Sequence, residues 1–216
     1  AASNCGSGSY ILEDSTGARL NYRQLVMRCF VLGSYIAKKS ASSERIGILL
    51  PSTVAGAATF FACQAYGRTA AMLNFTSGPQ GLIASVETAD IKRVITSESF
   101  VAAAKLEQEI RMLEGKVTVC YLENIRDEIS TKAKIKGLFL GLVPKTAHRI
   151  LRGRTNPKSP AAILFTSGSE GTPKGVVLSH ANLLSNYAQV ENIIDLTKKD
   201  KVLNALPIFH SFGLLG

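Results

Sequence analysis

Cysteine is scarce in this chain, with 4 residues among 216, and no two of them form a Cys-x-x-Cys pair. This scarcity excludes a disulfide scaffold, and the missing pair gives no support to a zinc site or a redox motif. Charged residues are also few, at 19%, whereas hydrophobic residues make up 46% and can fill a buried core. A disordered chain is therefore excluded. We interpret the cysteines as ordinary thiols in a reducing compartment and expect a cytoplasmic protein.

Acidic residues are missing from one long stretch, because no Asp or Glu lies between Glu128 and Glu170. Eight basic residues fall inside it: Lys132, Lys134, Lys136, Lys145, Arg149, Arg152, Arg154 and Lys158. The formal net charge is +9, so the rest of the chain is close to neutral. Nucleic-acid binders spread basic charge along a face, so we expect no nucleic-acid partner. Segment 132–158 is either a solvated connector or surface helix, or an element for an anionic membrane surface or an acidic protein. A membrane partner predicts a location peripheral to the inner face of a membrane.

Charge is also absent from Ile46–Gly67, a stretch long enough to be mistaken for a membrane span. Pro51 and several hydroxyl-bearing residues interrupt it. We interpret it as a buried strand followed by a buried helix that begins after Pro51. The N-terminal residues Ala1–Tyr10 are polar and uncharged, which is not typical of a signal peptide.

Short apolar runs alternate with helix-like segments in the first half of the chain. We expect strands at Ile46–Leu50, Ala71–Phe75, Arg93–Ile95 and Val117–Leu122. We expect helices after Asn21, with Gln24 completing a capping box, and over Val54–Tyr66, Pro79–Thr88 and Val101–Leu113. Continuous apolar strands separated by helices are typical of parallel strands covered on both faces. The predicted fold class is α/β, a doubly wound and mostly parallel sheet with flanking helices.

A loop rich in hydroxyls and glycine follows a further predicted strand, Ala161–Phe165. It reads Thr166-Ser167-Gly168-Ser169-Glu170-Gly171-Thr172-Pro173-Lys174-Gly175. Glycines let backbone N–H groups turn toward a ligand, hydroxyls donate to phosphate oxygens or reach a magnesium ion, and a lysine adds positive charge. Together these groups suit a polyphosphate. A strand-like run, Val176–Leu178, follows the loop, and Ser179 caps the next predicted helix.

Two commoner phosphate loops do not fit these residues. The Walker loop requires Gly-Lys-Ser/Thr at its end and opens a helix. Here Pro173 precedes Lys174, Gly175 follows it, and a strand-like run comes next. The dinucleotide fingerprint Gly-x-Gly-x-x-Gly is also absent. The remaining alternative is an ordinary turn between two strands, and ten consecutive residues of this composition argue against it.

Segment Phe165–Val176 resembles the signature loop of the adenylate-forming superfamily, which includes acyl-CoA synthetases, peptide-synthetase adenylation domains and luciferases. Leu206–Gly213 is similar to a second family motif, and Leu20–Leu25 to the segment that opens the family's large domain. Ser169-Glu170-Gly171 with Leu206–Gly213 is further similar to the synthetase half of the bacterial bifunctional acyl-[acyl carrier protein] synthetase/2-acylglycerophosphoethanolamine acyltransferases. The resemblance implies the N-terminal part of the large domain. Residues 1–122 would form its first lobe, 123–160 a basic connector, and 161–216 the start of a second lobe.

The resemblance implies an ATP-dependent ligase for a fatty acid. The carboxylate would attack the α-phosphorus of ATP, and the thiol of acyl carrier protein or coenzyme A would then displace AMP, in a reaction serving lysophospholipid reacylation. The implied nucleotide-binding residues are Thr166, Ser167, Gly168, Ser169, Glu170, Gly171, Thr172 and Lys174. Thr166 would also help to bind Mg²⁺. His210 would border the carboxylate and the α-phosphate, its alternative being a histidine packed at a strand end. Most of the superfamily has Thr where Glu170 stands.

The resemblance also implies functional parts beyond Gly216, namely an acidic adenine- and magnesium-binding motif, a ribose-binding aspartate and a C-terminal lobe with a catalytic lysine. No His-x-x-x-x-Asp acyltransferase motif occurs in this chain. We therefore interpret the chain as a fragment that is inactive alone. Two alternatives stay open: a non-catalytic nucleotide-binding or interaction domain, and a membrane-surface binding module.

Overall fold

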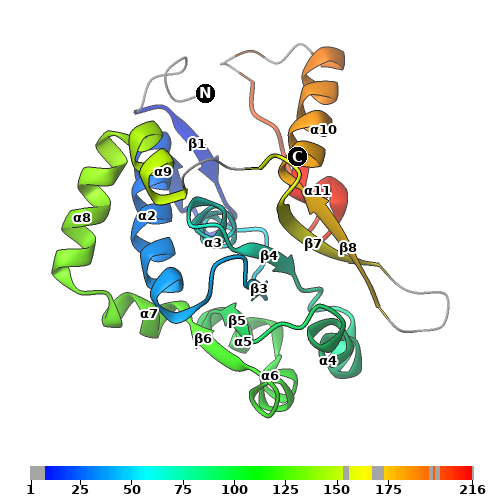
Figure 1. The fold of residues 1–216 in the computed structure, drawn as a ribbon. Coiled ribbons are helices and arrows are strands. Elements are labelled where there is room, and N and C mark those ends of the chain that lie inside the picture. The colour runs from blue at the N-terminus through cyan, green and yellow to red at the C-terminus, as the bar shows by residue number, and fades with distance from the viewer. Residues whose placement is uncertain (1–7, 153–155, 167–172, 195–196, 198–199, 216) are drawn as a thin grey trace.

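The computed structural model describes residues 8–152, 156–166, 173–194, 197 and 200–215. Among the described residues, six strands form one sheet in the order β6-β5-β3-β4-β7-β8 (Figure 1). They are β3 (Arg45–Ile48), β4 (Thr69–Met72), β5 (Arg93–Thr96), β6 (Thr118–Tyr121), β7 (Pro160–Thr166) and β8 (Lys174–Ser179). All neighbouring strands run parallel except β7 and β8, which are antiparallel. The predicted mostly parallel α/β sheet is confirmed.

Helices cover both faces of this sheet (Figure 1). One face carries α2 (Tyr22–Lys39), α3 (Val54–Ala65) and α7 (Leu122–Glu128), with α8 (Thr131–Leu142) and α9 (Pro144–Arg152) packed outside them. The other face carries α4 (Gly78–Thr88), α5 (Glu98–Ala104) and α6 (Glu107–Glu114). Two further helices, α10 (His180–Ile193) and α11 (Ser211–Leu215), follow β8. Each of the two large faces therefore has its own buried core.

Side chains alternate between the two cores along the central strands. In β4, Ala70 and Met72 lie in the core under α2 and α3, whereas Ala71 lies in the core under α4 and α6. In β7, Leu164 belongs to the first core and Ile163 to the second. Strands buried on both faces have no polar side to their pleat, which is why the sequence shows continuous apolar runs rather than an alternating pattern.

The uncharged stretch 46–67 forms strand β3 and helix α3, as predicted. No helix of the described residues is long and apolar enough to cross a membrane. Arg68 follows the stretch and is buried. Its guanidinium donates to the carbonyl oxygens of Ala37 (3.1 Å) and Ser40 (2.6 Å) at the end of α2. The buried charge is thus satisfied by the unpaired carbonyls of a helix C-terminus.

Two predicted helix starts are confirmed by reciprocal capping hydrogen bonds. The Gln24 backbone N–H donates to Asn21 Oδ1 (2.8 Å), and the Asn21 N–H donates to Gln24 Oε1 (3.0 Å). At α10, the Asn182 N–H donates to Ser179 Oγ (3.1 Å), and the Ser179 N–H donates back to Asn182 Oδ1 (2.9 Å). In each pair two of the helix's first N–H groups find partners, which fixes where the helix begins.

An N-terminal hairpin was not among the predicted elements. Strands β1 (Tyr10–Glu13) and β2 (Arg19–Asn21) pair antiparallel in a separate two-stranded sheet. Between them the Asp14 carboxylate accepts hydrogen bonds from the Thr16 N–H (3.0 Å) and from the Val54 N–H (2.9 Å). Burial raises the pKa of Asp14, but these hydrogen bonds outweigh it and hold the pKa below its ordinary value. Asp14 therefore joins the hairpin to the N-terminus of α3.

The predicted single helix Val101–Leu113 is wrong. The structure has α5, which begins at Glu98 after the capping residue Ser97, and then α6, with Lys105 between them in the left-handed region at φ 55°. The break lets the buried side chain of Leu106 enter the core at the turn. Strand β4 is also misplaced in the prediction, since it begins at Thr69 rather than Ala71.

The basic segment is helical rather than an irregular connector. Helices α8 and α9 occupy most of it, and α8 packs along α2. Strand β7 then returns to the sheet beside β4, so the strands on either side of the segment belong to one sheet. The division into 1–122, 123–160 and 161–216 stays a prediction.

Candidate functional site

The hydroxyl- and glycine-rich loop connects two paired strands. Thr166, the last residue of β7, lies opposite Lys174, the first residue of β8, and both are exposed. Phe165 and Val176 lie on these neighbouring strands, as predicted, and no helix begins at residues 173–179. The Walker geometry, in which the loop opens a helix, is thereby excluded. The predicted nucleotide-binding residues Ser167, Gly168, Ser169, Glu170, Gly171 and Thr172 lie outside the described residues.

Strand direction places this loop at one particular edge of the sheet. Because β7 runs parallel to β4, Thr166 lies at the carboxyl edge of the parallel strands. In open α/β sheets, ligands bind outside the carboxyl ends of the strands, where the strand order reverses. Here the order reverses around β3, which pairs with β4 on one side and β5 on the other. The carboxyl edge near β3, β4 and β7 is therefore the candidate site.

The second motif, Leu206–Gly213, docks on the same edge. The Ile208 N–H donates to Ser52 Oγ (3.0 Å), and Ser52 follows β3. Phe209 is buried, and its ring meets that of Phe75, which follows β4, edge to face at 5.1 Å between centroids. The loop after β7 and the motif Leu206–Gly213 are thus brought to the ends of adjacent strands.

His210 lies at the surface of this docked motif. Its side chain is exposed, its ring centroid lies 4.7 Å from that of Phe209, and its N–H donates to the Pro207 carbonyl (2.9 Å). Its own carbonyl accepts from the Leu214 N–H (2.9 Å), which closes the first turn of α11. The alternative prediction, a histidine packed at a strand end, is wrong, because His210 stands in an exposed turn.

Backbone packing holds the motif in a tight turn. A Cβ added to Gly213 would lie 2.0 Å from the Pro207 carbonyl oxygen, so only glycine fits there. The Gly213 carbonyl accepts a hydrogen bond from Asn204 Nδ2 (2.6 Å). Ser52, Phe75 and Asn204 are not among the residues predicted from the motifs. For the first two, the available signal is their place at predicted strand ends, because Phe75 closes the predicted strand Ala71–Phe75 and Ser52 lies two residues after Ile46–Leu50.

The groups at this edge suit a phosphate ligand. Thr166 supplies a hydroxyl and Lys174 a positive charge at the two ends of the loop. No group of three or more His, Cys, Asp or Glu among the described residues could hold a metal ion. Among the described residues at this edge, the Thr166 hydroxyl is a group that a magnesium ion could use, beside the phosphates of a bound nucleotide. Thr166 fits that role.

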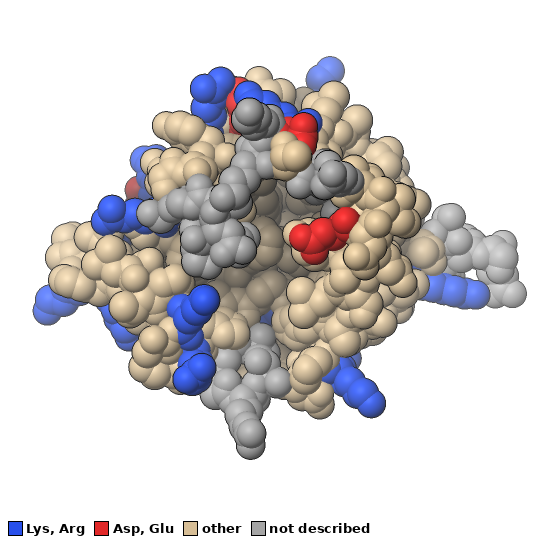
Figure 2. All heavy atoms as spheres, turned by 90° about the horizontal axis from the view of Figure 1, so that it is seen from above, with Lys and Arg blue, Asp and Glu red and all other residues tan. Residues whose placement is uncertain are grey.

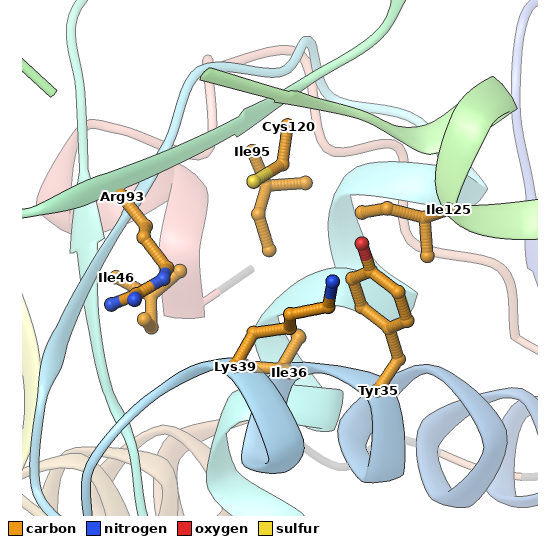
Figure 3. Close-up of a pocket in the computed structure, with 8 residues that line it drawn as sticks. All are labelled: Tyr35, Ile36, Lys39, Ile46, Arg93, Ile95, Cys120 and Ile125. Atoms are coloured by element: carbon orange, nitrogen blue, oxygen red, sulfur yellow. The ribbon is translucent and has the colours of Figure 1, made fainter. Parts of the chain in front are cut away.

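A cavity elsewhere in the fold does not offer a substrate site (Figure 3). It holds about 10 Å³, roughly the space of one water. Tyr35 and Lys39 of α2 point across it toward Ile95 and Cys120 of the sheet (Figure 3). The Tyr35 hydroxyl donates to Glu128 (3.0 Å), and burial together with this carboxylate raises the pKa of Tyr35 to about 12. The cavity is a packing feature between α2 and the sheet.

Comparisons with known proteins agree with this geometry. A family model described as AMP-binding enzyme matches residues 3–216. The chain is 29% identical over 212 residues to long-chain-fatty-acid–CoA ligase 5 of Rattus norvegicus, covering 91% of this chain and 31% of that enzyme. It is 28% identical over 207 residues to sulfoacetate–CoA ligase of Cupriavidus necator, covering 95% of this chain and 38% of that enzyme. The chain thus spans about a third of the curated relatives it matches.

Solved structures share the fold. A complex of VinN with L-aspartate superposes with a TM-score of 0.78 at 20% identity, covering 99% of this chain and 56% of VinN. The O-succinylbenzoate coenzyme A synthetase of Bacillus subtilis in complex with AMP superposes with a TM-score of 0.75 at 19% identity, covering 95% of this chain and 48% of the synthetase. At this identity the likeness shows the fold.

Proposed function

The chain belongs to the family of AMP-binding enzymes, and we propose that it supplies the phosphate-binding part of an ATP-dependent acid–thiol ligase. The observation that carries the proposal is the meeting of two motifs at one edge of the sheet. Thr166 and Lys174 bracket the loop at the end of β7, and Phe209 docks beside the end of β4, the strand next to β7. The remainder of the active site belongs to a longer protein, since the matched relatives are about three times as long.

The proposed reaction activates a carboxylic acid in two steps. A carboxylate oxygen attacks the α-phosphorus of ATP, and pyrophosphate leaves with the electron pair of the broken P–O bond. A thiolate then attacks the acyl carbon of the acyl-adenylate, and AMP leaves. Carboxylates are poor electrophiles, so the first step provides the leaving group that the second requires. The protein mainly positions the reactants and neutralises charge.

Each described site residue has a place in this scheme. Lys174, exposed at the start of β8, binds the β- and γ-phosphates as a point charge. The Thr166 hydroxyl binds phosphate or Mg²⁺, and a bound Mg²⁺ would neutralise the charge of the pyrophosphate group. His210, exposed on the docked motif, borders the carboxylate and the α-phosphate. In the loop, Ser167, Ser169 and Thr172 add hydroxyl donors, and the carboxylate of Glu170 is unfavourable beside phosphates unless Mg²⁺ or solvent offsets its charge.

We further propose a fatty acid as the substrate, and acyl carrier protein or coenzyme A as the thiol donor. The rat relative is named a long-chain-fatty-acid–CoA ligase, which supports both the fatty acid and coenzyme A. Similarity around Ser169-Glu170-Gly171 to the bifunctional acyl-carrier-protein synthetases favours the carrier protein and lysophospholipid reacylation in the cytoplasm. The relative named sulfoacetate–CoA ligase supports the reaction type with a different acid.

The test is Lys174→Ala in the longer protein, measured by exchange of labelled pyrophosphate into ATP in the presence of fatty acid. Losing a charged hydrogen bond to phosphate costs about 1.5–3 kcal/mol, which lowers the exchange rate by roughly tenfold to over a hundredfold. The matched control is Lys92→Ala, because Lys92 is exposed just before β5, at the opposite edge of the sheet. An unchanged rate for Lys174→Ala, or an equal loss for both variants, would contradict the proposal.

The chain of 216 residues is itself expected to show no exchange, because the proposed site needs groups from the longer protein. The same assay separates the enzyme from a non-catalytic nucleotide-binding domain. ATP binding by the longer protein without exchange would indicate the binding domain. Exchange by the isolated chain would refute the proposed division of the active site.

A further inference from the structure

Helix α8 turns its small residues toward the protein. Ala133, Gly137 and Gly141 recur along the side that packs on α2, and they are buried or half-buried. A Cβ added to Gly137 would lie 2.2 Å from a methyl carbon of Val31, and one added to Gly141 would lie 2.7 Å from Met27 Cγ. The two helices therefore pack so closely that larger side chains do not fit between them.

The large apolar side chains of α8 point the other way. Ile135, Leu138, Phe139 and Leu142 recur at i, i+3, i+4 and i+7, a spacing that places them on one helical stripe. Their side chains are exposed, Phe139 by 64% and Leu142 by 54%. A surface helix ordinarily turns its apolar stripe to the core. This arrangement is inverted, and exposed apolar patches of this kind mark interaction sites.

Basic side chains accompany the stripe. Lys132, Lys134 and Lys136 alternate along the first turns of α8, and Lys145 and Arg149 lie exposed one turn apart on α9. Neither helix contains an acidic residue. None of the five takes part in an ion pair among the described residues. Figure 2 shows Lys and Arg side chains spread over the side of the molecule on which α8 lies, with uncharged side chains between them.

We propose that this face of α8 and α9 binds the surface of an anionic lipid bilayer. A helix with large apolar side chains beside lysines suits the boundary between headgroups and acyl chains. There the apolar side chains contact the acyl chains and the lysines contact the headgroups. Helix α8 lies at the outer edge of the fold, where a flat membrane can reach it (Figure 1). The apolar stripe with lysines along one surface helix favours a bilayer over an acidic protein partner, which the experiments test as the alternative. The proposal does not depend on the proposed ligase activity.

The first experiment measures flotation of the chain with two kinds of vesicle, phosphatidylglycerol mixed with phosphatidylcholine and phosphatidylcholine alone, over a salt series. The variant replaces Lys132, Lys134, Lys136, Lys145 and Arg149 by Gln. Each basic residue at an anionic surface contributes about fivefold in partitioning, so losing only two engaged charges lowers it by roughly 25-fold. The attraction should fade at high salt as the Debye length shrinks below about 8 Å. The matched control replaces Lys38, Lys92, Lys105, Lys116 and Lys201 by Gln.

The second experiment reports insertion of the apolar stripe. The chain has no tryptophan, so Phe139→Trp introduces a single indole on this face. Its fluorescence should shift to shorter wavelength with anionic vesicles and not with neutral ones. The control is Tyr187→Trp on α10, another exposed aromatic position, whose emission should stay unchanged. Phe139→Ser with Leu142→Ser should lower partitioning by about tenfold, while circular dichroism shows that the fold is kept.

Three outcomes would overturn the proposal. One is equal flotation of the wild-type chain and the Gln variant. Another is an indole of the Phe139→Trp variant that does not respond to anionic vesicles. The last is a result in which the five basic residues are needed for binding to soluble polyglutamate but not for binding to vesicles. That result would assign the charges to an acidic protein partner.

Discussion

Phe209→Ala and Phe212→Ala form a matched pair within the Leu206–Gly213 motif. Both substitutions remove the same atoms at positions three residues apart. Phe209 is 4% exposed and packs against Phe75, whose ring also contacts Phe100. Phe212 is 80% exposed. The structure therefore predicts a large loss of stability for one phenylalanine and almost none for the other, although the two look alike in the sequence.

The magnitudes follow from burial. Replacing a buried phenylalanine by alanine costs about 3–5 kcal/mol, because the transfer free energy is lost and a cavity remains. Of this, roughly 0.5–1.5 kcal/mol reflects the edge-to-face ring contact with Phe75. Phe212→Ala should stay within about 0.5 kcal/mol, since solvent already surrounds the ring. For a chain of this size the expected fall in melting temperature is ~6–20 °C for Phe209→Ala and under ~2 °C for Phe212→Ala.

Urea unfolding of the chain, followed by circular dichroism, measures both variants. The midpoint should fall for Phe209→Ala with an unchanged m-value, which separates lost stability from a changed unfolded state. Phe209→Leu, which keeps most of the volume, should recover more than half of the loss. A cost below about 1 kcal/mol for Phe209→Ala would refute the docking of the motif on Phe75. It would also remove the structural basis for placing His210 at the carboxyl edge.

Three further perturbations have expected outcomes that denaturation can check. Gly213→Ala should lower the free energy of unfolding by about 1–3 kcal/mol, because its Cβ would meet the Pro207 carbonyl oxygen at 2.0 Å. Gly115→Ala should leave it nearly unchanged, because the nearest atom to its Cβ would lie at 3.5 Å. Similar losses for the two variants would contradict the tight turn. Asp14→Asn should lower the free energy of unfolding by about 1 kcal/mol near neutral pH and by little in acid. The reason is that the pKa of Asp14 is held below its ordinary value of 3.8, so the carboxylate stabilises the fold above pH 3.8 and loses this effect as pH falls. Burial raises the pKa of Cys29 and Cys63 from 9.0 to about 12, so their contribution to the free energy of unfolding is full below pH 9.0 and is lost as pH rises toward 12. Replacing both cysteines by Ala should make the free energy of unfolding depend less on pH in this range. An unchanged pH dependence would refute the role of the two thiols.

Much of the fold could be predicted because its signals are local. The capping box of Asn21 and Gln24 and the apolar runs of β3 and β5 are visible in a few residues each. The break between α5 and α6 was missed, because Lys105 adopts φ 55° without a glycine or proline to signal it. Leu106, Ile110 and Leu113 all follow the break, keep a helical spacing among themselves and lie buried. There, tertiary burial of Leu106 decides where the chain turns.

The candidate site was predicted in part for a related reason. The composition of the loop after β7 identifies it in the sequence, and strand pairing places Thr166 opposite Lys174. Ser52 and Phe75 have ordinary neighbours in the sequence, and only the sheet order brings them under Leu206–Gly213. Long-range contacts of this kind carry no local pattern. A sequence can therefore show which segment holds the chemistry before it shows what holds that segment in place.

Helices α8 and α10 both expose large apolar side chains, and charge distinguishes what each can bind. On α10, Leu184 and Tyr187 are 66% and 58% exposed, and none of the helix's residues is buried. Helix α10 contains no lysine or arginine, so it has no basic side chain to draw it to an anionic surface. On α8, glycine packing against α2 fixes the helix, and lysines border its stripe. Because attraction to anionic lipid is screened by salt and apolar packing is not, salt dependence should appear for α8 alone.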